Sequence, residues 1–196
     1  MTVKRCWESS DPAYAAYHDE EWGRPVTDER GLYERLCLEG FQSGLSWLTI
    51  LRKRAAFRAA FAGFDPDAVA RFGPHDVDRL LGDAGIVRHR GKIEAAIANA
   101  RATLALRDSE TSLPELVWSH RPASPTAPRT RADWQASTPE SAALSKRLRA
   151  AGFRFVGPTT VYATMQACGV VNDHLAGCPA RPEVERALAQ ARLPAH

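Results

Sequence analysis

The segment VNDHLAGCP, residues 171–179, places His174 and Cys178 four positions apart near the end of the chain. An imidazole nitrogen and a thiolate are both transition-metal ligands, and this pair would supply half of a tetrahedral site. The other half must come from elsewhere in the sequence. Cys6 and His18 lie near the opposite end, within KRCWESSDPAYAAYHDEEWG.

Together these four side chains form a Cys₂His₂ set, which suits tetrahedral Zn²⁺. Four protein ligands leave no open coordination position, so the set predicts one structural zinc ion per chain. Such an ion would join the N-terminal segment to the C-terminal segment and make folding depend partly on the metal. On the residues alone, the alternative is two ordinary structural histidines with unrelated cysteines.

A carboxylate stands out in CLEGFQSGLSW. Leu32, Leu36 and Glu39 recur at i, i+4 and i+7, which places the glutamate on the apolar face of a helix. A carboxylate there is salt-bridged, exposed at the helix edge, or kept for a function. Gly40 and Gly44 are expected to break this helix and to allow another group to approach closely.

Aromatic residues gather around this carboxylate in the sequence. Trp47 follows Glu39 at the start of the next predicted helix. An acidic group with aromatic neighbours is typical of a pocket for a flat, cationic ligand, which gains from charge attraction and from cation–π contact. Core packing is the alternative for each aromatic residue taken singly. The N-terminal segment that zinc would hold adds Trp7, Tyr14, Tyr17 and Trp22.

The stretch GFRFVGPTTVYATMQACGVVNDH predicts a helix, a tight turn centred on Gly157 and a second helix, together a hairpin over about residues 148–168. Backbone amides at such a turn, and at the N-terminus of the following helix, can bind a phosphate without reading the base. The candidate contacts to a DNA backbone are therefore Gly157 and Thr159. An ordinary helix–helix connection is the alternative.

Helical periodicity dominates the elements that must position these residues. The expected helices cover residues 28–39, 46–61, a short helix capped by Asp65 and Pro66, 91–106, 139–151, 158–168 and 183–192. No stretch alternates apolar and polar residues, so we predict an all-α protein. Segment 108–139 interrupts the helices, but Trp118 and Trp134 indicate that it packs onto the rest. We expect one unit over 1–185 and a polar tail over 186–196.

The composition of the chain limits its possible partners and its location in the cell. The chain has 196 residues, 44% of them hydrophobic, and a net charge of +3, which permits contact with nucleic acid without indicating it. No apolar run reaches membrane-spanning length and the N-terminus lacks a secretory signal, so we expect a cytoplasmic protein without membrane contact. Disulfides are then not expected, and Cys37 and Cys168 are interpreted as core residues.

Taken together, the motifs resemble the 3-methyladenine DNA glycosylase I family, a branch of the helix-hairpin-helix glycosylases. The resemblance covers roughly residues 4–180. It rests on RCW, DPAYAAYHDEEWG, CLEGFQSGLSWLTIL, DAGIVRHRGKIEAAIANA, GFRFVGPTTVYATMQACGVVNDH and the trailing GC. It implies a helix-hairpin-helix glycosylase-like fold. It also places the zinc ligands at Cys6, His18, His174 and Cys178.

The resemblance implies hydrolysis of the N-glycosidic bond of 3-methyladenine in alkylated double-stranded DNA. The lesion would be flipped out of the duplex into the pocket. Glu39 would then hydrogen-bond the purine edge with Tyr17 beside it, and Trp47 would stack on the ring. The further aromatic residues of the pocket would be Trp7, Tyr14 and Trp22.

Two positions narrow the implied mechanism. Many relatives in the superfamily carry a catalytic Asp where this chain has Asn172, and Asp173 falls one residue later. Bifunctional relatives carry a Schiff-base lysine where this chain has Thr159. We therefore predict a monofunctional glycosylase without lyase activity. Phe41, where a Gln is common in the family, departs from the pattern at the pocket edge.

Two other functions compete with this one. A non-catalytic, zinc-stabilised helix-hairpin-helix module would bind DNA through the same zinc and hairpin, but it has no need of Glu39 beside Trp47. A zinc hydrolase would need an open coordination position, which the four ligands do not leave. For either DNA-binding function we expect a monomer acting on duplex DNA.

Overall fold

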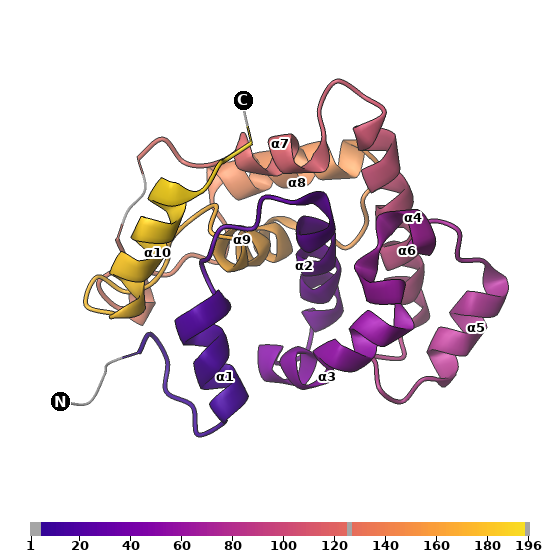
Figure 1. Ribbon diagram of the computed structural model, residues 1–196, viewed down its shortest axis with the longest axis horizontal. Helices are drawn as coiled ribbons and strands as arrows, with labels where there is room; N and C mark the ends of the chain where they lie inside the picture. The colour runs from indigo at the N-terminus through magenta and orange to yellow at the C-terminus, as the bar shows by residue number, and fades with distance from the viewer. Residues whose placement is uncertain (1–4, 125–126, 195–196) are drawn as a thin grey trace.

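The computed structural model describes residues 5–124 and 127–194, and all regular structure in these ranges is helical (Figure 1). The described residues contain no β-strand, which confirms the prediction of an all-α protein. The helices and short helical turns are α1 (Pro12–Ala16), η1 (Tyr17–Glu21), α2 (Glu29–Gln42), α3 (Trp47–Ala60), η2 (Ala62–Phe64), α4 (Pro66–Val69), α5 (Pro74–Gly82), α6 (Arg90–Arg107), α7 (Leu113–Trp118), η3 (Arg131–Asp133), α8 (Pro139–Ala150), α9 (Pro158–Ala167) and α10 (Ala180–Gln190).

Capping side chains set where the main helices begin. Asp28, Ser46 and Thr138 each accept a hydrogen bond from the backbone N–H three residues later, at 2.8, 3.2 and 3.2 Å. These bonds satisfy N–H groups that the first helical turn leaves without a partner. Asp65 and Pro66 begin α4 as the sequence predicts. Sequence reasoning missed α1, α5 and α7, which are short.

The end of α2 differs from the sequence prediction. Gly40 does not break the helix, because α2 continues to Gln42 and the chain turns in residues 43–46, where Gly44 has a φ of +81°. A Cβ at Gly40 would lie 3.4 Å from the Cβ of Phe155. The glycine therefore lets the turn between α8 and α9 approach α2, rather than ending the helix.

Helix α2 lies at the centre of the molecule, between α1 and α10 at one end and α4, α5 and α6 at the other (Figure 1). It packs against α3, α6 and α9. Leu32, Leu36 and Leu38 are at most 1% exposed, and burying each such side chain contributes about 1.5–3 kcal/mol. Cys37 and Cys168 are also buried and unpaired, as predicted for core residues.

The segment at 108–139 packs onto the rest of the protein, as its tryptophans predict. Trp118 is 1% exposed and donates a hydrogen bond from Nε1 to the carbonyl of Val26 at 2.9 Å. Trp134 donates from Nε1 to the carbonyl of Asp173 at 2.9 Å. These two bonds attach a Pro-rich segment to residues near the two ends of the chain.

The C-terminal part packs back onto the beginning of the chain, where α10 contacts η1. Val184 and Leu188 of α10 are buried in the main core. The expected division between residues 185 and 186 therefore falls inside a packed helix. None of the described helices has the length and hydropathy needed to cross a membrane.

Candidate metal centre and aromatic pocket

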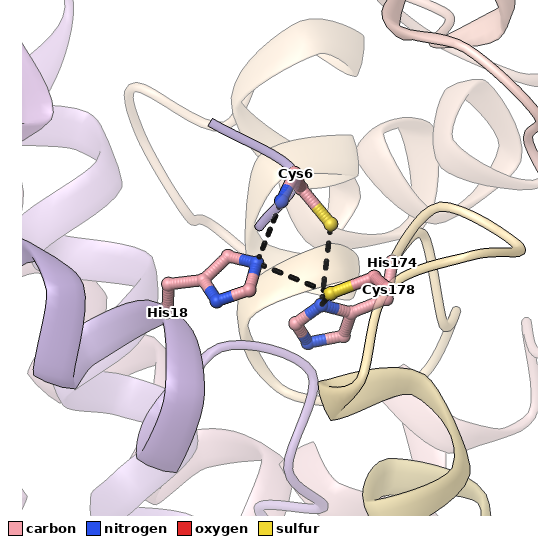
Figure 2. Close-up of side chains that lie close together, drawn as sticks. All are labelled: Cys6, His18, His174 and Cys178. Atoms are coloured by element: carbon pink, nitrogen blue, oxygen red, sulfur yellow. Dashed lines mark hydrogen bonds between the residues drawn. The ribbon is translucent and has the colours of Figure 1, made fainter. Parts of the chain in front are cut away.

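Two cysteines and two histidines from the ends of the chain meet in one buried cluster. The ligand atoms of Cys6, His18, His174 and Cys178 all lie within 4.8 Å of one another. Figure 2 shows the four side chains pointing toward a common centre, His18 from η1 and the last two from the loop before α10. This arrangement can hold one metal ion.

The spacing inside the cluster fits a tetrahedral ion. Zn–S bonds of about 2.3 Å and Zn–N bonds of about 2.0–2.1 Å imply a sulfur–nitrogen edge of about 3.5 Å in a regular tetrahedron. The distance from Cys6 Sγ to His174 Nδ1 is 3.4 Å, and Cys178 Sγ lies 3.6 Å from His174 Nδ1 and 3.6 Å from His18 Nε2. These three sulfur–nitrogen distances therefore match the edge that shared coordination requires.

The second nitrogen of each imidazole is held by the protein. His18 Nδ1 bonds Asp19 Oδ1 at 2.7 Å, and Arg5 donates to both oxygens of that carboxylate. His174 Nε2 bonds the carbonyl of Trp22 at 2.9 Å. Such partners orient metal-ligating histidines and fix which nitrogen faces the ion.

Burial makes this cluster unfavourable without a cation. All four side chains are at most 3% exposed. Burial raises the pKa of Cys6 to about 12, and burial lowers the pKa of His174 to about 4. A bound cation would offset the cost of forming the thiolates. Because all four positions are filled by protein atoms, the site is closed.

The N-terminal segment that carries two of these ligands also builds the wall of a neighbouring cavity. In η1, a π-helical turn, His18 enters the metal cluster and the preceding Tyr17 lines the cavity. The Trp7 ring packs edge-on against the His18 ring at 4.6 Å between centroids and lines the same cavity. A metal that fixes the cluster therefore also fixes this wall.

This cavity has a volume of about 210 Å³, below the roughly 300–1,000 Å³ of sites for drug-sized ligands, so it suits a single heterocycle. Two other cavities have volumes of about 440 and 520 Å³, but the lining of each has only one aromatic side chain, so neither places a flat ring between aromatic faces. The lining residues are Trp7, Tyr14, Tyr17, Trp22, Glu39, Gln42, Trp47, Arg131, Trp134, Ala163 and Gln166.

Glu39 is the only carboxylate in this lining, and it is 5% exposed. Within the described residues, no hydrogen bond reaches its carboxyl group. Burial raises the pKa of Glu39 to about 8, and the charge of Arg35 opposes that rise only in part. Arg35 is itself engaged, because it donates to Glu21 at 3.0 Å.

Glu21 compensates the positive charge beneath the pocket. Burial raises the pKa of Glu21, but hydrogen bonds from Arg54 and Arg35 outweigh this effect and hold the pKa at about 2. The ionised carboxylate thus neutralises part of the charge that Arg35 places against the Tyr17 ring, at 5.8 Å from its centroid. The electrostatic repulsion that a cationic ligand would meet in the cavity is therefore reduced.

Two tryptophans of the lining have an indole N–H group without a partner among the described residues. Trp7 Nε1 and Trp47 Nε1 are buried and make no hydrogen bond to any described residue. A buried donor without an acceptor is costly, and such groups are rare outside functional sites.

The structure brings all six residues of the predicted pocket around this one cavity, although their contacts to a base stay predictions. The rings of Tyr17 and Trp47 lie 5.3 Å apart at 43°. Sequence reasoning missed five lining residues. Trp134 was expected to pack but was not placed here, and nothing in the local sequence marks the other four, Gln42, Arg131, Ala163 and Gln166.

Helices α8 and α9 pack together and are joined by a turn, while the helix-hairpin-helix over about residues 148–168 stays a prediction. The turn is not centred on Gly157, which has a φ of −63° and caps the N-terminus of α9. Its left-handed positions are Gly152 and Phe155, with φ of +96° and +55°. Gly157 and the exposed Thr159 lie outside the cavity lining, so any role in binding DNA is separate from the pocket.

Comparison with known proteins gives consistent matches. A family model described as methyladenine glycosylase matches residues 7–181. DNA-3-methyladenine glycosylase 1 of Escherichia coli (strain K12) is 52% identical over 184 residues, 92% of this chain and 98% of that protein. A crystal structure of 3-methyladenine DNA glycosylase I superimposes with a TM-score of 0.88 at 52% identity, covering 91% of this chain and all of that one. The structure of 3-methyladenine DNA glycosylase I from Staphylococcus aureus superimposes with a TM-score of 0.85 at 38% identity, covering 89% of this chain and 94% of that one.

Proposed function

The chain belongs to the methyladenine glycosylase family, and from this membership we propose that it is a DNA repair enzyme that hydrolyses the N-glycosidic bond of 3-methyladenine in alkylated double-stranded DNA. The observation that carries the proposal is Glu39, a buried carboxyl group without a partner in a small aromatic cavity. The relatives that match the chain are named 3-methyladenine DNA glycosylases, which also supports the proposal.

Selection of the lesion follows from charge. In the free protein at neutral pH, a pKa of about 8 keeps Glu39 mostly protonated. Methylation at N3 makes the purine cationic, and a cation in the cavity favours the ionised carboxylate. The pair then forms a charge-assisted hydrogen bond, and the aromatic faces add cation–π attraction. Neutral adenine gains neither contribution and is bound less well.

The cationic methylated purine is already a good leaving group, so the enzyme need not protonate it. Water attacks the sugar carbon C1′ and loses one proton to the solvent, and the electron pair of the breaking C1′–N9 bond passes to the purine, which becomes neutral. A neutral product no longer attracts the ionised Glu39, so the bond that selected the substrate weakens as the base is released. The base must first be flipped out, with the DNA backbone held near Gly157 and Thr159 at the α8–α9 turn.

We propose a monofunctional enzyme. The described lining of the cavity contains no lysine that could form a Schiff base. The Asn172 side chain is turned into its own loop, where it accepts from the His174 N–H at 3.3 Å and donates to the Arg181 carbonyl at 3.4 Å. Neither a lyase step nor water activation at position 172 has a group to perform it.

We assign the Cys₂His₂ cluster a structural Zn²⁺, on the match of its distances to tetrahedral coordination. The ion would tie the N-terminal wall of the pocket to the loop before α10. It supplies no open position for a substrate. The enzyme is proposed to act as a cytoplasmic monomer.

The test is release of free base from methylated duplex DNA by the zinc-loaded protein, followed by chromatography. Release of 3-methyladenine, but not adenine, is the expected result. If the protein binds the DNA and releases no base, the non-catalytic zinc-stabilised module is the better account. A rate that depends on the identity of the bound metal would favour the zinc hydrolase instead.

A further inference from the structure

Phe155 combines two features that are unfavourable for a phenylalanine. It is 40% exposed and, with Leu45, is one of two large hydrophobic side chains exposed in the described residues. Its φ of +55° lies in the left-handed region, which a bulky side chain rarely adopts. Glycine or asparagine would meet the same backbone requirement with less strain.

The protein holds this conformation firmly. The side-chain amide of Asn99 in α6 pairs with both backbone groups of Arg154, accepting from its N–H at 2.7 Å and donating to its carbonyl at 3.1 Å. Phe155 follows directly, with its Cβ close to where a side chain at Gly40 would lie. The turn is thereby clamped between α6 and the helix that carries Glu39.

The surroundings of the exposed ring favour a polyanion. Arg149 and Arg154, which lie in or beside the α8–α9 turn, are exposed, and neither forms an ion pair in the described part of the chain. A guanidinium nitrogen of Arg149 lies 3.6 Å from where a Cβ at Gly157 would stand. Free cations beside a helix N-terminus attract phosphate, and an exposed aromatic ring in the same turn can pack against the apolar face of a sugar.

We propose that Phe155 is a DNA-contact residue whose ring packs against a deoxyribose of the strand held by the α8–α9 turn. This rests on the proposed function, because it takes duplex DNA as the partner. Backbone strain and exposure are then retained because the ring becomes buried only in the complex. Covering its exposed part predicts a contribution of roughly three- to tenfold in affinity.

The test uses the zinc-loaded full chain and methylated duplex DNA. Phe155→Gly and Phe155→Asn both accept the left-handed conformation, so each is expected to keep its melting temperature within about 4 °C of the wild type. Both should bind DNA about three- to tenfold more weakly, with the wild-type slope of log K against log salt, because no phosphate contact is lost. Phe155→Trp should retain wild-type affinity.

Two matched controls separate the causes. Ala62→Gly relieves the same left-handed strain at an exposed position with φ of +50°, remote in sequence from the turn, and should leave DNA affinity unchanged. Arg154→Ala should lower the salt slope by about one, as loss of one phosphate contact predicts. Binding of free 3-methyladenine, followed by tryptophan fluorescence, should be unchanged in the Phe155 variants.

Unchanged DNA affinity in Phe155→Gly and Phe155→Asn would overturn the inference and make the ring an anchor of the turn. A changed salt slope in these variants would also overturn it, because the turn itself would have moved. If the wild type excises 3-methyladenine normally in either case, the proposed function stands. Failure of the wild type to bind duplex DNA would overturn both.

Discussion

Glu39→Gln is expected to stabilise the free protein while reducing its activity. The side-chain amide has the shape of the protonated acid but cannot ionise, so the substitution removes only the cost of a buried charge. Because Glu39 has no hydrogen-bond partner in the described residues, no ion pair is broken. Opposite effects on stability and activity would mark the carboxyl group as kept for function.

The magnitude follows from the raised pKa of Glu39. Its rise from 4.5 to about 8 means that the folded state holds a proton that the unfolded state releases between these pH values. The free energy of unfolding of the wild type therefore falls as pH rises through this window, by about 1.4 kcal/mol per pH unit. Relative to Glu39→Gln, the wild type should be about 3 kcal/mol less stable at pH 7 and about 5 kcal/mol less stable above pH 8.

The assay is denaturant unfolding of both zinc-loaded proteins at pH 5, 7 and 8.5. The difference between them cancels the pH dependence of the metal cluster, which both contain. Excision of 3-methyladenine by the variant should fall at least about tenfold, the loss expected when a hydrogen bond to a charged group is removed.

A stability difference below about 1 kcal/mol at pH 8.5, or one that does not grow with pH, would refute the argument from burial. Full excision activity in the variant would refute the role of the carboxylate in selecting the base. The two results are independent, so each part of the reasoning can fail alone.

The remaining predictions concern the metal and the wall of the pocket. Cys178→Ser should lose bound zinc and at least about 5 °C in melting temperature, whereas Cys168→Ala should keep one zinc per chain. Replacing Zn²⁺ by Co²⁺ should change the absorption spectrum and the stability but leave the excision rate within about twofold, since the ion has no open position. Asp173→Asn should weaken binding of free 3-methyladenine about threefold or more, because the Asp173 carboxylate accepts from Gln166, a residue of the cavity lining, at 2.8 Å and from the Tyr162 hydroxyl at 2.7 Å; unchanged binding would show that Gln166 keeps its position without the carboxylate.

That Cys6, His18, His174 and Cys178 can form a candidate metal site could be predicted from residue types, because thiolate and imidazole side chains are typical zinc ligands. The helices at 46–61, 91–106 and 158–168 were also predictable, since their caps and periodicity are local. The short helices were missed because a few residues carry too little periodicity. Gly40 was misread as a helix breaker because its neighbour, Phe155, is more than a hundred residues away in the sequence.

The sequence by itself determined that the protein is helical, that Cys6, His18, His174 and Cys178 can share an ion, and that an acidic residue lies among aromatic ones. Only the tertiary structure decided that, among residues 5–124 and 127–194, Glu39 has no hydrogen-bond partner and two indole N–H groups have no acceptor. The reason is physical: residue type sets which interactions a side chain can make. Packing between distant segments determines which of these interactions form inside the protein. The polar groups that remain without a partner are then available to bind a ligand.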